Sequence, residues 1–314
     1  MSTVALAQHS AYAGYAWLAP LLSKKCLVNK PTNLLGLDAN HKGCYEVWAN
    51  LGFAQKIYWN YILRESENVI YFGASAISFA QKILRCTNPL EKKKNSVVII
   101  SDSIFFKQLK FFLDLFYGNN VYIFIMPDMM HLVPDSLNPV PFYQYVEIPR
   151  AIHEEKSKIL SVAHSPGSKR HSDLKGTSRI EAACRKIGVP LDVISGMPWE
   201  ESVKAKARSQ LFVDQCLNIN QFNYSGGLGK SGIEAMHVRC AVLTSGGIPD
   251  TRGFFPPPPI IPVTPTTIES EIQKLLDSNF LIEEVQEKQV EWARTYTNRE
   301  FVVEHIKSRL DFIN

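Results

Sequence analysis

The sequence lacks any cysteine pattern that would indicate a metal site or a disulfide framework. Its six cysteines form no CxxC pair and no Cys/His cluster with zinc spacing. They are Cys26, Cys44, Cys86, Cys184, Cys216 and Cys240. This distribution excludes a small disulfide-stapled scaffold and favours free, buried thiols in a reducing compartment.

Long apolar runs and a basic leader are also missing. The longest apolar stretches, Phe111–Phe116 and Val121–Met126, are far shorter than the roughly 20 residues that span a bilayer. The opening residues, MSTVALAQ, contain no basic side chain and only a short apolar run. We therefore expect no signal peptide, no stable membrane insertion and a cytoplasmic location.

Repeats, low-complexity tracts and a strong charge bias do not occur either. The 314 residues are 46% hydrophobic and 20% charged, which is enough apolar material for two domains. The formal net charge of +4 is too small to indicate nucleic acid by itself, but it suits an anionic ligand.

Short β-branched or aromatic runs alternate with helical patterns along the chain, which indicates βαβ units and parallel sheets. The expected strands are 4–8, 69–72, 97–100, 121–126, 143–147, 159–164, 191–194, 211–215 and 241–244. The expected helices are 45–64, 76–85, 104–116, 177–187, 199–207, 230–238, 266–276 and 285–310. The pattern predicts an α/β protein of two Rossmann-like, doubly wound domains facing each other across a cleft.

The charged stretch Glu154–Lys158 marks the expected boundary between the two sheets. We predict an N-terminal domain over 1–156 and a C-terminal domain over 157–297, with a final helix at about 298–314 crossing back to the first. Ligands of such sheets bind at the carboxyl ends of the strands, so the cleft is the expected site.

A basic loop follows the expected strand at 159–164. It reads HSPGSKRHSDLKGT and brings Lys169, Arg170 and Lys175 to one strand end. Cations placed there can neutralise a phosphate, and arginine can do so through two hydrogen bonds. A merely solvated basic loop is the alternative.

A second, glycine-rich loop, NYSGGLGKSGIEAM, precedes the expected helix at 230–238. Its glycines allow backbone amides to approach a ligand, and the helix presents its positive end, so a phosphate fits there. The loop does not match a P-loop, because Tyr224 stands where the first glycine is required. Glu234 is placed either to accept bonds from ribose hydroxyls or only to complement the helix dipole.

These segments, in this order, resemble the C-terminal domain of the GT-B glycosyltransferases of family 4, the group 1 type. The resemblance covers about residues 157–280, whereas the N-terminal half matches only in its α/β pattern. It is carried by the segments SVAHSPG, KGT, LFVDQ, YSGGL, IEAM, AVLT and PPPIIPVTP.

The resemblance implies roles for particular residues. Lys175 and either Lys169 or Arg170 would bind the donor diphosphate, and Glu234 would contact the donor ribose. The remaining donor-binding residues would be Ser165, Gly196 and Met197 of the segment that flanks the nucleobase, and the glycine-rich loop. From that loop they would be Tyr224, Gly226, Gly227, Leu228 and Gly229. Acceptor-side residues would be His9 and Gly14. The family's first paired glutamate is replaced by Gly226.

The implied reaction is transfer of a hexosyl or pentosyl group from a nucleotide-diphosphate sugar to an acceptor hydroxyl. Cationic side chains and helix amides would stabilise the leaving phosphate, with retention at the anomeric carbon and with neither a metal nor a cofactor. We take Arg170, Lys175 and Asp102 as catalytic. Candidate general bases are Asp102, His9 and Asp38.

The acceptor and the competing functions stay open at this point. A glycan or small molecule is one acceptor class. Duplex DNA with a hydroxymethylated base is another, which the basic stretches Lys92–Lys94 and Lys107–Lys110 would follow. A catalytically inactive GT-B-like nucleotide-binding module and a P-loop-like nucleotide-binding protein are the alternatives to an enzyme. His164 and the aromatic stretch Tyr58–Tyr61 are expected to serve packing.

Overall fold

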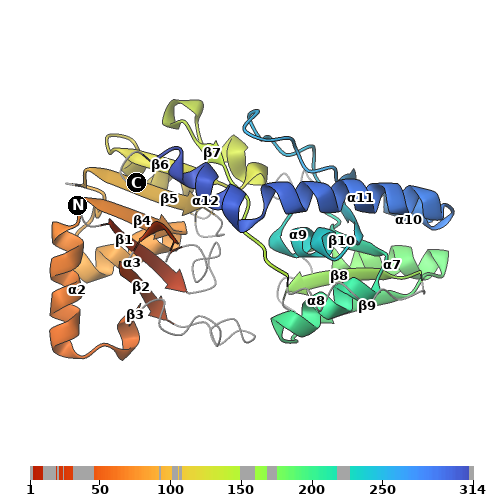
Figure 1. The fold of residues 1–314 in the computed structure, drawn as a ribbon, viewed down its shortest axis with the longest axis horizontal. Coiled ribbons are helices and arrows are strands. Elements are labelled where there is room, and N and C mark those ends of the chain that lie inside the picture. The colour runs from red at the N-terminus through yellow and green to blue at the C-terminus, as the bar shows by residue number, and fades with distance from the viewer. Residues whose placement is uncertain are drawn as a thin grey trace. The chain divides into compact units, whose positions relative to one another are not determined.

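A computed structural model describes most of the chain. The residues described are 3–9, 19, 21–23, 25–30, 46–91, 93–100, 105, 108–148, 160–167, 175–217 and 227–310. By internal contacts the chain divides into unit 1, Met1–Tyr145 with Val302–Asn314, and unit 2, Val146–Phe301. Both units are α/β (Figure 1).

The described strands of unit 1 form a seven-stranded parallel sheet in the order β3-β2-β1-β4-β5-β6-β7. These strands are β1 (Thr3–His9), β2 (Lys25–Lys30), β3 (Glu46–Val47), β4 (Asn68–Phe72), β5 (Asn95–Ile100), β6 (Val121–Ile125) and β7 (Val140–Pro141). The described helices are α2 (Phe53–Glu65), α3 (Ala74–Leu84) and α5 (Leu109–Phe116), with short 3-10 helices at Trp48–Asn50, Pro127–Leu132 and Asp135–Leu137. β4 and β5 are buried along their whole length, which explains their unbroken apolar runs.

The described strands of unit 2 form a five-stranded parallel sheet in the order β12-β11-β10-β8-β9. These strands are β8 (Val162–Gly167), β9 (Leu191–Ser195), β10 (Leu211–Gln215), β11 (Ala241–Thr244) and β12 (Ile261–Pro262). The helices are α7 (Thr177–Ile187), α8 (Trp199–Arg208), α9 (Lys230–His237), α10 (Ile268–Leu276) and α11 (Asn279–Tyr296). Val162, Leu211 and Ala241, one from each central strand, share a core with α7 and α10.

The α/β class and the parallel sheets are confirmed, but several expected elements are wrong. Residues 143–147 form no strand, and the edge strand is β7 instead, two residues long. The helix expected from residue 45 begins only at Phe53, because Gly52 serves as its N-cap and its amide donates to Gln55 Oε1 at 2.9 Å. The long helix expected over 285–310 is divided between α11 and α12 (Arg299–Lys307).

The division between α11 and α12 has a local cause. Asn298 Oδ1 accepts a hydrogen bond from the Phe301 amide at 2.7 Å, which is the geometry of a helix N-cap. In unit 1, His305 of α12 contacts the Pro141 carbonyl through Nε2 at 2.9 Å. The last part of α12 therefore belongs structurally to unit 1.

α2 is apolar on its outer face as well as on its inner one. Trp59 is buried as expected, but Tyr58 and Tyr61 are 54% and 61% exposed, so the expected core packing is wrong for the two tyrosines. Among the described residues, no helix combines the length and the apolarity that a membrane crossing requires.

Candidate functional site

The candidate site lies at the carboxyl ends of β8 and β10. The strands of unit 2 run β9-β8-β10-β11-β12, so the chain order reverses between β8 and β10. Ligands of open α/β sheets bind at such a switch point. The chain leaving β8 leads to Lys175 and α7, and the chain leaving β10 leads to Gly227–Gly229 and α9. The sheet thus brings Lys175, which ends the basic loop, and Gly227–Gly229, which end the glycine-rich loop, to one edge.

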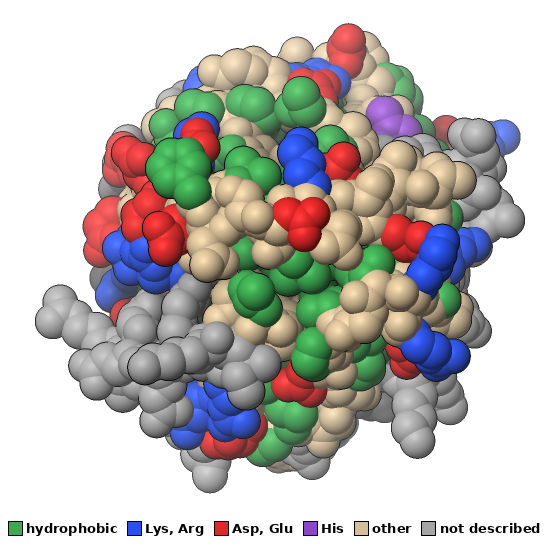
Figure 2. All heavy atoms as spheres, turned by 90° about the vertical axis from the view of Figure 1, so that its right-hand side faces the viewer, with side chains coloured by type: hydrophobic (Ala, Val, Ile, Leu, Met, Phe, Trp, Pro, Cys, Tyr) green, Lys and Arg blue, Asp and Glu red, His purple; other side chains and the backbone are tan. Residues whose placement is uncertain are grey.

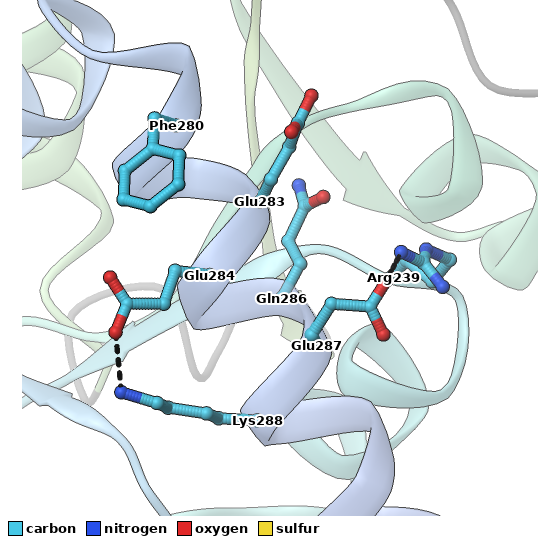
Figure 3. A pocket seen from close by; sticks show the side chains of 7 residues that line it. All are labelled: Arg239, Phe280, Glu283, Glu284, Gln286, Glu287 and Lys288. Carbon is cyan, nitrogen blue, oxygen red and sulfur yellow. Dashed lines mark hydrogen bonds and ion pairs between the residues drawn. The ribbon is translucent and has the colours of Figure 1, made fainter.

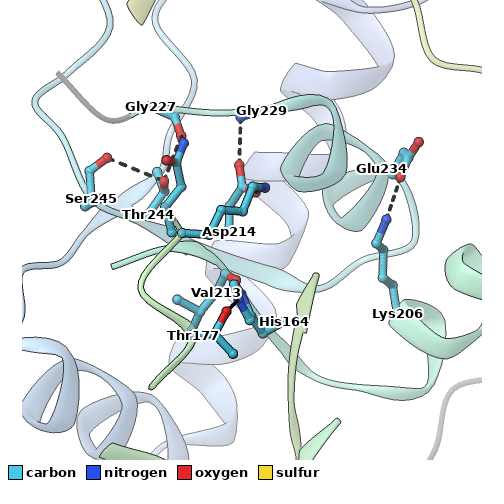
Figure 4. A network of polar contacts seen from close by, with 12 residues as sticks. His164, Thr177, Lys206, Val213, Asp214, Gly227, Gly229, Glu234, Thr244 and Ser245 are labelled. Carbon is cyan, nitrogen blue, oxygen red and sulfur yellow. Dashed lines mark hydrogen bonds and ion pairs between the residues drawn. The ribbon is translucent and has the colours of Figure 1, made fainter. Parts of the chain in front are cut away.

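Asp214, near the end of β10, contacts both Lys175 and Gly229. Figure 4 shows its contact with Gly229. Its Oδ1 lies 2.6 Å from Lys175 Nζ, and its Oδ2 accepts a hydrogen bond from the Gly229 amide at 2.7 Å. The Asp214 side chain is fully buried, whereas that of Lys175 is 23% exposed. Asp214 therefore fixes a cation from one loop and a backbone amide from the other.

The Gly227 carbonyl is held by side chains from two strand ends (Figure 4). Gln215 Nε2 donates to this oxygen at 2.7 Å, and the Thr244 hydroxyl donates to it at 2.8 Å. Buried polar groups with satisfied partners specify one conformation. The described part of the glycine-rich loop is therefore built into the sheet edge.

Gly176 allows the start of α7 to lie directly against the end of β10. Its φ is +73°, and a Cβ placed there would lie 2.0 Å from the Cys216 carbonyl oxygen. The Cys216 amide donates to the Lys175 carbonyl at 3.0 Å. Only glycine fits this close approach, which explains why glycine follows Lys175.

His164 of β8 is a structural residue, as the sequence predicted. It is fully buried, and its Nδ1–H donates to the Val213 carbonyl at 2.7 Å. Its Nε2 accepts from the Thr177 hydroxyl at 2.9 Å. These two contacts assign the neutral Nδ1–H tautomer and tie β8, β10 and α7 together.

Burial lowers the pKa of His164 from 6.5 to about 4, although its hydrogen bond to Val213 opposes this shift. Because the unfolded chain then binds the proton more tightly, the contribution of neutral His164 to stability is present above pH 6.5 and is lost as the pH falls toward 4. We expect the free energy of unfolding of His164→Gln to vary less between pH 6.5 and 4 than that of the wild type, by up to about 3 kcal/mol. Urea denaturation at several pH values measures how the free energy of unfolding changes with pH. The same change with pH in both proteins would contradict the buried, neutral state of His164.

Glu234 lies in the second turn of α9 and is 5% exposed. Its Oε2 contacts Lys206 Nζ at 2.5 Å, and its Oε1 accepts from Trp199 Nε1 at 2.8 Å. Burial alone would raise the pKa of Glu234. The charges of Lys206 and Lys230, with the hydrogen bonds from Lys206 and Trp199, hold it below its ordinary value. Glu234 is therefore an ionised, oriented acceptor.

The other sequence-predicted residues are distributed as follows. Ser165 is buried on β8, and Gly196 and Met197 follow β9, with Gly196 exposed at a φ of +71°. His9 is the last residue of β1. Gly14, Asp38, Asp102, Lys169, Arg170, Tyr224 and Gly226 lie outside the described residues.

Sequence reasoning missed the residues that hold the site together. Asp214 and Gln215 could have been recognised from the sequence, because two polar residues end an otherwise apolar, buried strand. Nothing in the sequence marks Lys206 and Trp199 as site residues, since an exposed helical lysine and a buried one look alike in a sequence. Within the described part of the chain, His, Cys, Asp and Glu side chains form no group of three or more that could hold a metal ion.

A surface hollow of about 580 Å³ lies along α11, away from these residues (Figure 3). It is lined by Arg239, Phe280, Glu283, Glu284, Gln286, Glu287 and Lys288. Its charges are largely paired with each other, Glu284 with Lys288 and Glu287 with Arg239. The face of unit 2 in Figure 2 likewise mixes acidic, basic and apolar side chains. The hollow contains no sequence-predicted site residue.

No protein-family model matches the sequence, and no curated protein sequence matches it either. Solved structures do. HepE (Alr3699) from Anabaena, in complex with UDP and glucose, is similar over 99% of both chains, with 11% identity and a TM-score of 0.67. HepE in complex with UDP-glucose gives a TM-score of 0.64 over the same coverage. The chain has a GT-B fold.

TarM is a second similar structure, at 15% identity and a TM-score of 0.55. The likeness covers 82% of this chain and 57% of TarM. At such identities the likeness concerns the fold. The GT-B fold that the sequence motifs suggested is thus confirmed, and the activity has to be argued from the residues at the sheet edge.

Proposed function

We propose that this GT-B protein is a glycosyltransferase that moves a sugar from a nucleotide-diphosphate donor to an acceptor hydroxyl. The observation that carries the proposal is the juxtaposition of Lys175 with the start of α9, both fixed by buried Asp214 at the switch point of unit 2. A cation beside a helix N-terminus suits a diphosphate. HepE, whose fold is similar, has been solved with UDP-glucose.

In the proposed reaction the bond between the anomeric carbon and the β-phosphate oxygen breaks, the acceptor oxygen bonds to that carbon, and the acceptor proton passes to the leaving phosphate. Negative charge develops on the leaving phosphate, where Lys175 would stabilise it. The Gly229 amide is engaged by Asp214, so the loop amides proposed to face the diphosphate are those of Gly227 and Leu228. Glu234 would accept hydrogen bonds from the donor ribose. The proposal includes retention and transfer without a metal.

We expect Lys175→Ala to weaken UDP binding at least ten-fold, about 1.4 kcal/mol, because a charge-assisted contact to phosphate is lost. Uridine, which has no phosphate, should bind the variant as it binds the wild type. Isothermal titration calorimetry measures both. Lys186→Ala, which removes a 71% exposed lysine from α7, is the control. Unchanged UDP affinity in Lys175→Ala would overturn the donor-site assignment.

An inactive nucleotide-binding module is the second candidate function, because Gly226 stands where the family has its first paired glutamate. Turnover distinguishes an enzyme from such a module. Mass spectrometry of UDP-glucose, GDP-mannose and related donors should detect slow release of free sugar with excess EDTA present. Donor binding without any hydrolysis or transfer would support the module. Hydrolysis that requires an added divalent cation would contradict the metal-free part of the proposal.

A glycan or small molecule is the proposed acceptor class. One observation argues against the alternative of duplex DNA following Lys92–Lys94. Lys93 Nζ donates to the Leu63, Arg64 and Ser66 carbonyls at the end of α2, so this lysine stabilises a helix terminus. A gel shift with duplex DNA that weakens steeply with salt would reverse this choice.

A further inference from the structure

The carboxylate of Glu234 is held by two partners that both come from α8. Trp199, the first residue of that helix, donates from Nε1 to Oε1 at 2.8 Å, and Lys206 occupies Oε2. Figure 4 shows the Lys206 ammonium directed at Glu234. Two partners on one rigid helix leave the carboxylate a single orientation, since each oxygen has its own donor.

Lys206 is itself an unusual lysine. Its side chain is only 1% exposed, and its Nζ lies between Glu234 and the face of Phe212, 5.7 Å from the ring centroid. Desolvating an ammonium and a carboxylate together is costly, and well-packed apolar residues would be as stable or more so. Stability alone therefore does not account for a charge pair here.

The position of the pair relates it to the candidate site. Glu234 lies on the helix that follows Gly227–Gly229, so it is close to the glycine-rich loop along the chain. Trp199 lies two residues after Met197, directly after the segment expected to flank a nucleobase. The contact between Trp199 and Glu234 therefore connects the expected ribose contact to the end of the expected base-binding segment.

We propose that Lys206 is a positioning residue for the donor ribose: it fixes the Glu234 carboxylate, together with Trp199, in the orientation that accepts the ribose hydroxyls. This inference rests on the proposed function. It adds a residue that touches no part of the donor and acts through Glu234.

The test compares Kd for UDP with Kd for 2′-deoxy-UDP and 3′-deoxy-UDP by calorimetry. Wild type should bind UDP about ten-fold or more tightly than at least one deoxy form, because a hydroxyl bonded to a carboxylate is lost. Lys206→Met should reduce this ratio to about two or less at pH 6. Lys204→Met, a 40% exposed lysine on the same helix, should keep the wild-type ratio.

A pH series distinguishes positioning from packing. The groups facing Glu234 are Lys206 and Trp199 from α8 and Lys230 from α9 itself. In the wild type the carboxylate stays ionised, so the ratio should be flat from about pH 6 to 9. In Lys206→Met the burial of Glu234 is opposed by Lys230 and Trp199 without Lys206, so the pKa of Glu234 rises. The part of the ratio that recovers as the pH increases then reports ionisation, and the part still lost at about pH 9 reports the lost orientation.

Two further variants keep the proposal testable if Lys206→Met does not fold. Lys206→Arg should preserve the ratio, because it retains the charge, and Lys206→Gln should lower it. A wild-type ratio in Lys206→Met and Lys206→Gln at every pH would overturn the proposal and leave Lys206 a packing residue. Equal affinity of the wild type for UDP and both deoxy forms would refute the role of Lys206 but not the proposed function.

If the protein binds neither UDP nor GDP, both the role of Lys206 and the proposed function are refuted. If the protein prefers GDP, the comparison is made with GDP and its two deoxy forms.

Discussion

Gly176→Ala should lower the free energy of unfolding of unit 2 by at least about 3 kcal/mol, because two penalties add. An alanine at a φ of +73° is strained, and its Cβ would lie 2.0 Å from the Cys216 carbonyl oxygen, which belongs to the backbone and cannot rotate away. Relief requires α7 and the end of β10 to separate, which displaces Lys175. Differential scanning calorimetry should show a drop of about 10 °C in the transition of unit 2, and UDP binding should weaken in parallel.

Gly188→Ala is the matched control for this change. Gly188 has nearly the same φ, +72°, but no atom lies within 4 Å of the site of its Cβ. Its substitution should cost only the strain of the left-handed conformation, about 1 kcal/mol. Equal destabilisation by the two substitutions would mean that the contact with Cys216 is not the determining feature at Gly176.

Asp214→Ala should cost about 2 to 3 kcal/mol of unfolding free energy and at least ten-fold in UDP affinity. The change removes the partner of Lys175 and the acceptor of the Gly229 amide at once. The cost lies below that of a fully buried pair, because Lys175 is 23% exposed and water can solvate its ammonium in part. Urea denaturation and calorimetric titration measure the two effects.

Asp214→Asn separates the two contacts of Asp214. An amide oxygen can still accept from the Gly229 amide, but no ion pair with Lys175 remains, so the loss of stability should be about half that of the alanine variant. Asp192→Ala, which removes an exposed carboxylate from strand β9 at the edge of the same sheet, should change neither property. If Asp214→Ala behaves like Asp192→Ala, Asp214 does not organise the site.

The fold class was predictable because the central strands are buried and therefore mostly apolar. The strands at 69–72, 97–100, 211–215 and 241–244 were all recognisable on this basis. The motifs at Lys175, Gly227–Gly229 and Glu234 were recognisable because glycine and charge follow buried strands in a fixed order. The comparison with HepE confirms the fold that this order suggested.

What the sequence concealed depends on contacts between distant segments. β3, β7 and β12 are each two residues long, too short for a period to show. In the run at 143–147, Tyr143, Tyr145 and Val146 are buried, which gives the run a strand-like pattern, although its backbone joins no sheet. Lys206 meets Glu234 across 28 positions of sequence, and nothing near either residue marks the pairing.

Both α7 and α9 begin at glycines, Gly176 and Gly229. A glycine at the N-cap has no side chain that could accept hydrogen bonds from the first helical amides, which costs a few tenths of a kcal/mol per helix. At Gly176 the close Cys216 carbonyl excludes any larger residue, so the first amides of α7 keep no side-chain acceptor. A bound anion would supply the missing acceptor to both helices, and occupancy of this edge would be reported by the melting of the whole unit.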